Sequence, residues 1–199
     1  MLLLSASLLQ ADNGDGTKVQ TKPGHRVRLI YYLSGVAGPK EADAIVQGVK
    51  QLKTVTTASV DTDRGFLKIS FDSQELSYHQ VAQAINDAGD GFGKKYDPRV
   101  VISVPDYAKP DVKPKIDAIL GDEKLKPLIR IEAIDEAKGI FFVHFLPLKL
   151  DPAKTGTQGF NGGALTHPIH MVPPTGLALP FRYYNDDSPE IPVYKPATP

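Results

Sequence analysis

The chain has 199 residues, 41% of them hydrophobic, which is enough for one moderate domain or two small ones. Its 23 basic and 23 acidic residues cancel and form no long run of either sign, so the chain lacks the basic face that nucleic acid or an anionic membrane requires. It contains no cysteine, which excludes disulfides, thiolate metal sites and a cysteine nucleophile.

Residues 1–25 are predicted to be a leader. Met1–Gln10 reads MLLLSASLLQ, an apolar run typical of a signal peptide and too short to span a bilayer. We therefore expect export to a periplasmic or extracellular location; the alternative is a buried N-terminal strand or helix. The sequence DNGDG at 12–16 lacks the remaining ligands of a calcium loop and predicts a flexible continuation of the leader.

Residues 26–97 predict one β-α-β-β-α unit. Apolar residues alternate from Val27 to Leu33, which indicates a strand with one buried face. Pro39 suits the first position of a helix whose apolar residues then recur at helical spacing. Residues 55–61 and 67–71 predict a β-hairpin around a turn that contains glycine.

A second helix is predicted to begin at Ser77, because Ser77 and Gln80 form a capping-box pattern, and to end at Gly89. Two one-sided helices bury their apolar stripes only against one face of the sheet. With right-handed crossovers this gives an α+β, ferredoxin-like sandwich. The fourth strand of that sandwich is expected after the helix, either at 91–96 or by shared use of 100–104.

The landmarks of this unit resemble those of the heavy-metal-associated domain family over about sixty residues. The matching positions are Gly35-Val36, Ile45, Val55, Val60-Asp61, Phe71-Asp72, Ala84-Ile85 and Ala88-Gly89. Members of the family carry G-M-x-C-x-x-C before the first helix, whereas this chain has Gly38 and Glu41 at the two cysteine positions. The resemblance implies a ferredoxin-like binding domain, and the missing thiolates exclude thiolate metal transfer at this loop.

Residues 98–165 predict a second, degenerate copy of the unit. Its apolar positions repeat those of the first copy, with Lys109 and Val112 at the two cysteine positions. Pro114 is tolerable if it lies in the first turn of a helix. The last helix is expected from Asp151, and four glycines between 156 and 163 predict that it is short or replaced by a loop.

From Thr166 to the end, the chain carries eight of its seventeen prolines together with several aromatic residues. Proline excludes central strands and helix interiors, and aromatic residues argue against simple disorder. Residues 166–199 are therefore predicted to form an extended, proline-rich tail that wraps over the sheet.

His167, His170 and Met171 form the candidate metal site. Two imidazoles and a thioether suit copper, and imidazoles alone suit zinc. His144, on a predicted strand, could complete the site only if the tail folds back onto it. His79 has no evident partner and is expected at the surface.

The preferred hypothesis is a non-catalytic binding module whose sheet faces or tail recognise a partner protein. The second hypothesis is a copper or zinc carrier that uses the tail ligands, and the third is an enzyme that has reused the sandwich, for which no catalytic motif is recognised. Open sheet edges at Val100–Val104 and in the hairpins are ready templates for a homo-oligomer.

Overall fold

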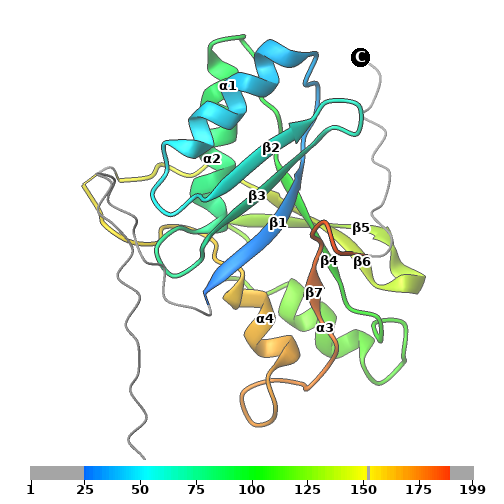
Figure 1. The fold of residues 1–199 in the computed structure, drawn as a ribbon. Helices are drawn as coiled ribbons and strands as arrows, with labels where there is room; N and C mark the ends of the chain where they lie inside the picture. The colour runs from blue at the N-terminus through cyan, green and yellow to red at the C-terminus, as the bar shows by residue number, and fades with distance from the viewer. Residues whose placement is uncertain (1–24, 152, 189–199) are drawn as a thin grey trace, which may run out of the picture.

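The computed structural model describes residues 25–151 and 153–188, where one twisted sheet carries four α-helices (Figure 1). The sheet has seven strands, and every strand pair is antiparallel. The first 24 residues, which include the predicted signal peptide and the DNGDG segment, lie outside the described residues.

The first half of the sheet follows the predicted order of elements. It consists of β1 (Arg26–Tyr32), α1 (Pro39–Lys50), β2 (Thr57–Asp61), β3 (Phe66–Asp72) and α2 (Tyr78–Asp90). Proline stands at the start of α1, as its missing N–H favours. The capping box of α2 is confirmed: the Ser77 hydroxyl accepts from the Gln80 N–H, and the Gln80 side chain accepts from the Ser77 N–H.

The fourth strand of this half is β4 (Arg99–Ser103). The order β2-β3-β1-β4, with two helices on one face, is that of a ferredoxin-like sandwich. Of the two candidates for this strand, 91–96 is a turn and irregular segment, and the shared strand near 100–104 is the one observed. Because β4 lies between β1 and β6, the expectation that it is an open edge is wrong; the edges are β2 and β5.

The second half uses β4 as its own first strand. It continues with α3 (Lys113–Leu120), β5 (Ile129–Asp135), the 3-10 turn η1 (Glu136–Lys138), β6 (Ile140–Phe145), α4 (Gly163–His170) and β7 (Arg182–Tyr183). Pro114 lies in the first turn of α3, where it is tolerated. The strand order β5-β6-β4-β7 repeats the order of the first half, with β4 common to both.

The last helix of the second half lies further along the chain than predicted. Instead of beginning at Asp151, it begins at Gly163 and includes Pro168. Residues 166–170, expected to be extended, are therefore helical. The physical reason is burial: Leu165 and Ile169, one turn apart, are both fully buried, and this packing outweighs the helix penalties of glycine and proline.

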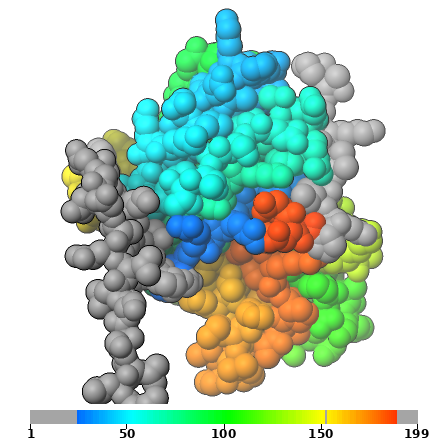
Figure 2. Space-filling model, in the orientation of Figure 1, coloured from blue at the N-terminus to red at the C-terminus, as the bar shows by residue number. Residues whose placement is uncertain are grey.

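The segment around Tyr184 separates β1 from β4 beyond the two residue pairs that join these strands. The strands pair at Tyr31–Val100 and Tyr32–Arg99 and then diverge. Tyr184 enters the gap, where its N–H donates to the Val101 carbonyl at 2.9 Å and its carbonyl accepts from the Ile30 N–H at 3.2 Å. Figure 2 shows the end of the described chain, in red, lying against β1, in blue. The tail thus completes the sheet.

Apolar side chains divide between the two faces of the sheet. All four helices cover one face and contribute to a single contiguous core, which includes Tyr31, Ile45, Ile85, Ile116 and Leu165. The other face holds a smaller cluster around Tyr32, Phe142 and Tyr184 and carries no helix among the described residues. None of the helices in the described part of the chain is both long and apolar enough to cross a membrane.

Candidate functional site

A hollow of about 520 Å³ lies where the chain passes from β1 into α1. It is lined by Ala37, Gly38, Pro39, Lys40, Glu41 and Phe92, and is called the α1 hollow below. Phe92 lies two residues after the end of α2 and keeps 40% of its surface exposed. An apolar hollow beside an exposed aromatic ring is a common form of protein-binding surface.

Glu41 connects the loop that lines the α1 hollow to the chain segment after α2. One carboxylate oxygen lies 2.8 Å from the Lys94 Nζ, and the other accepts from the Ala37 N–H at 3.0 Å and from the Tyr96 hydroxyl at 3.3 Å. Only 12% of the Glu41 side chain is exposed. The heavy-metal-associated domain family, which this unit resembles, has its second cysteine at this position. Here a carboxylate at the same position bonds the loop to the chain that follows α2.

The electrostatics of this contact favour the ionised carboxylate. The hydrogen bond from Lys94 lowers the pKa of Glu41 below its ordinary value, although partial burial opposes this shift. Burial, together with the neighbouring Glu41 carboxylate, raises the pKa of Tyr96 to about 12, so the phenol remains a donor at neutral pH. Glu41 is thus a charged group with its acceptor positions in use, rather than a free metal ligand.

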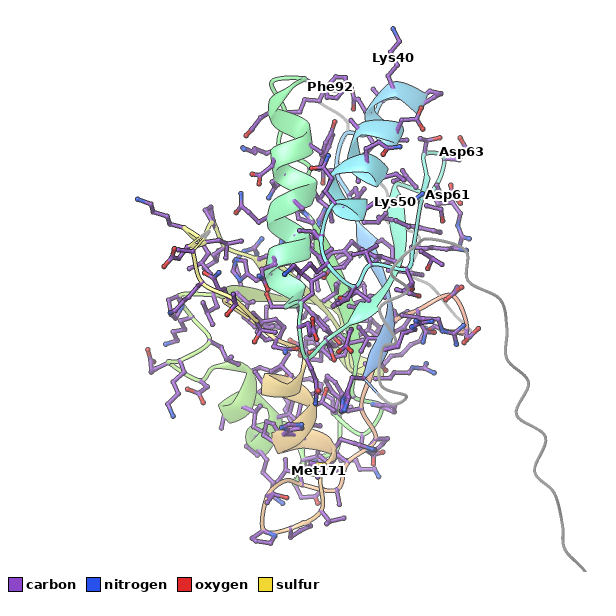
Figure 3. All side chains as sticks on the ribbon, turned by 60° about the vertical axis from the view of Figure 1, so that its left-hand side comes forward. Lys40, Lys50, Asp61, Asp63, Phe92 and Met171 are labelled. Atoms are coloured by element: carbon purple, nitrogen blue, oxygen red, sulfur yellow. The ribbon has the colours of Figure 1, made fainter. Side chains whose placement is uncertain are left out.

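The rim of the α1 hollow carries a positive charge. Lys40 is exposed, and it has no ion pair within residues 25–151 and 153–188. The N-terminus of α1 adds to this potential, because no side chain caps its first N–H groups, although the Glu41 carboxylate in the first turn partly offsets it. Figure 3 shows Lys40 and Phe92 at one end of the molecule and Met171 at the opposite end.

The predicted tail ligands lie together at the end of α4. His167 and His170 occupy the last turn of this helix and are exposed, and Met171 follows with 45% of its surface exposed. The His170 Nδ1 lies 3.1 Å from the Leu179 carbonyl oxygen. The structure therefore keeps these three residues near one another in the chain, on a helix end instead of an extended tail.

His144 lies on the opposite face of the sheet from α4 and does not join them. In β6 it shares a face with Phe142, on the side of the sheet without helices, whereas α4 packs on the other side. The reason is the two-residue period of a strand, which points His144 away from its neighbours Val143 and Phe145 in the helix-covered core.

His144 belongs to a charged cluster that sequence analysis did not find. Its Nε2 lies 2.8 Å from a Glu132 oxygen, its Nδ1 lies 3.6 Å from an Asp97 oxygen, and the Arg130 guanidinium lies against the ring. The neighbouring His144 ring is the main cause that lowers the pKa of Asp97. Three separate chain segments supply these groups, which is why no local pattern signals them. A pocket of about 330 Å³ adjoins the cluster.

His79 is also not where the sequence indicated. Instead of lying at the surface, it is 1% exposed, and its Nε2 lies 2.7 Å from the Leu146 carbonyl. Burial lowers its pKa, which favours the neutral imidazole. The ring packs against Phe145 and fills the space between α2 and β6, so its role is structural.

No protein-family model matches this chain, and no curated protein sequence matches it. Among solved structures, a proposed copper-ion-binding protein from Bacillus anthracis str. Ames is similar at 23% identity and a TM-score of 0.33, covering 37% of this chain and 94% of its own. The water-soluble region of the P-type ATPase CopA from Bacillus subtilis is similar at 15% identity and a TM-score of 0.35, covering 60% of this chain and 76% of its own. The N-terminal soluble domains of the same ATPase give 15% identity and a TM-score of 0.31, covering 64% and 83%. The chain has an α+β, ferredoxin-like fold, as its own strand order establishes.

Proposed function

We propose that this protein is a non-catalytic binding module that recognises a partner protein at the α1 hollow. The observation that carries the proposal is the exposed Phe92 ring beside the apolar residues Ala37 and Pro39. Ala37 lies on the loop between β1 and α1, which Glu41 holds in place. A fixed apolar surface loses little entropy when a partner binds, so it supports binding without any metal.

The charges at the rim define the chemistry of the partner. The Lys94 ammonium is offset by the Glu41 carboxylate, which leaves the charge of Lys40 and the uncapped end of α1. Both favour an acidic group on the partner. The segment that fits is one in which an apolar or aromatic side chain enters the hollow next to an aspartate or glutamate.

The alternative of an enzyme is less well supported by the side chains described. The candidate for a general base is His144, but only 5% of its side chain is exposed. Carboxylates of Asp97 and Glu132 face its two ring nitrogens. A general base needs a nitrogen within reach of substrate. The cluster instead links the start of β4 to the edge strand β5.

Selection from a displayed library of random peptides tests the proposed surface. The full chain is the target, and the enriched peptides are then measured against Phe92→Ala, Lys40→Gln and Ile134→Ala. Ile134 is the matched control, because it is 38% exposed on the edge strand β5, away from the hollow. We expect peptides with an apolar residue beside an acidic one, and affinities reduced by about tenfold in Phe92→Ala, which corresponds to about 1.4 kcal/mol.

The Lys40→Gln variant should weaken the same peptides less and mainly at low salt, because an exposed charge is screened. No enrichment, enrichment of basic peptides, or equal loss of affinity in Phe92→Ala and Ile134→Ala would each contradict the proposal.

We also propose that the module works outside the cytoplasm. Support comes from the apolar run Met1–Gln10 and is independent of the fold. N-terminal sequencing of the protein recovered from its native cells tests this directly. A mature chain beginning near Ala11 is the expected result, and an intact N-terminus on protein retained in the cytoplasm would refute export.

A further inference from the structure

Three potential metal ligands lie at the end of α4: His167 and His170 in its last turn, and Met171 directly after it as the C-cap residue. His167 and His170 are three positions apart and Met171 is four positions after His167, and residues at these spacings are neighbours on a helix surface. All three side chains are exposed. A cation at this place also benefits from the negative end of the helix dipole.

The hydrogen bond of His170 leaves its other nitrogen available. A carbonyl oxygen only accepts, so the Nδ1 that lies 3.1 Å from the Leu179 carbonyl carries the proton. In the neutral imidazole, Nε2 then keeps its lone pair. A backbone carbonyl on the second nitrogen is the usual way in which a metal-binding histidine is oriented.

The chain after α4 holds this arrangement in place. The Leu177 N–H donates to the Pro168 carbonyl at 3.1 Å, and the Leu179 N–H donates to the Ile169 carbonyl at 2.9 Å. The Ala178 N–H donates to the Met171 carbonyl at 2.8 Å. Residues 171–179 thus fold back onto the helix end, and the backbone of Met171 is fixed beside His170.

No hydrogen bond or ion pair holds the His167 side chain in its present position among the described residues. Its ring now lies over Gly163, where an added Cβ would be 3.4 Å from Cε1. The ring is exposed, and no hydrogen bond to it occurs in the described part of the chain. Rotation between staggered side-chain conformations is therefore open to it.

The donor set defines the cation. No group of three or more histidine, cysteine, aspartate or glutamate side chains that could hold a metal occurs in the described ranges, so the candidate ligands at α4 are the two histidines and the methionine. Two imidazoles and a thioether are soft to borderline ligands, and thioether sulfur selects Cu(I). We propose that the last turn of α4 binds one Cu(I) ion through His167, His170 and Met171. This site is separate from the α1 hollow, at the opposite end of the molecule (Figure 3).

Anaerobic titration of the full chain with Cu(I), in competition with a chromophoric chelator, tests this site, with Zn(II) titrated in parallel. We expect one Cu(I) per chain. His167→Ala/His170→Ala should abolish binding of both metals, and Met171→Leu should weaken Cu(I) by at least about tenfold while leaving Zn(II) unchanged. His25→Ala is the matched control and should bind as the original chain does.

Circular dichroism of each variant verifies the fold, which these exposed substitutions should preserve. Retention of Cu(I) by the double variant, equal affinity of Met171→Leu for Cu(I), or no Cu(I) binding by the unmodified chain would overturn the proposal. A loss of Cu(I) in His25→Ala would move the site away from α4 and overturn it as well.

Discussion

The Glu41 carboxylate meets the Lys94 ammonium at 2.8 Å, although 53 positions separate the two residues in the sequence. This pair closes the loop between β1 and α1 against the chain that follows α2. In the heavy-metal-associated domain family, which this unit resembles, two thiolates hold a metal at this loop. Here the loop is held by a carboxylate, an ammonium group and a phenol. The surface around Phe92, which we propose as the binding surface, is therefore held in place by side chains of this chain.

Glu41→Gln should destabilise the protein by about 1 kcal/mol, because it removes the charge-assisted contact with Lys94 and retains one acceptor for the Ala37 N–H. The Lys94 side chain is 39% exposed, so solvent screening limits the effect. Urea unfolding at neutral pH measures it. Asp43→Asn, an exposed acid two residues further along α1, should change stability by less than about 0.5 kcal/mol.

The contribution of Glu41 should also depend on pH with a defined sign. Because its pKa is lowered in the folded state, the unfolded chain binds more protons in the acidic range, and stability falls as the pH decreases. The difference in free energy of unfolding between the original chain and Glu41→Gln should be fully present at pH values above the ordinary pKa of a glutamate. It should vanish at pH values below the lowered pKa of Glu41. A difference that grows on acidification would contradict this account.

Tyr184→Ala should cost about 3 kcal/mol, because it empties a site that is 2% exposed between β1 and β4. Amide exchange should accelerate at Ile30, whose N–H donates to the Tyr184 carbonyl. Phe92→Ala is the control for loss of an aromatic ring and should leave stability nearly unchanged. If Tyr184→Ala is equally mild, the tail does not complete the sheet.

Gly139→Ala should destabilise the second half of the fold by about 3 kcal/mol. Gly139 has a φ of 63°, and an added Cβ would overlap the Val104 carbonyl oxygen that lies beside the turn into β6. Gly91→Ala is the matched control, since that glycine has a φ of −62° and open space around it. Thermal unfolding of both variants measures the difference; similar melting temperatures would show that the close approach at Gly139 is absent.

His144→Gln should raise the pKa of Asp97 toward its ordinary value, because the contact with the His144 ring is the largest cause of its lowering. Nuclear magnetic resonance titration of the side-chain carboxyl carbon follows this pKa directly. The stability that Asp97 contributes is present at neutral pH and lost as the pH falls through its lowered pKa. An unchanged pKa of Asp97 in the variant would show that His144 does not govern this carboxylate.

Local patterns in the sequence predicted most of the first half of the fold. Ser77 and Gln80 specify a capping box within four residues, and Pro39 marks the start of α1, so neither needs tertiary information. The alternation around Val100 predicts a strand but is the same for an edge strand and for one shared between two halves. Only the pairing of β4 with β1, β6 and β7 decides that question.

The sites were less predictable because they depend on contacts between distant segments. His167, His170 and Met171 are adjacent in sequence and could be proposed together, whereas their position on a helix depends on the burial of Leu165 and Ile169. The α1 hollow joins the start of α1 to Phe92 from the end of α2. No periodicity or motif connects two such segments, so sequence analysis identified the loop but not its surface.

The measurement that tests the central claim most directly is a map of backbone amide shifts in the isotope-labelled full chain as an acidic, aromatic peptide from the selection is added. The account predicts perturbations concentrated at Ala37, Lys40 and Phe92, which disappear in Phe92→Ala and persist in Ile134→Ala. Perturbations confined to the edge strands β2 and β5, or to the end of α4, would contradict recognition at the α1 hollow.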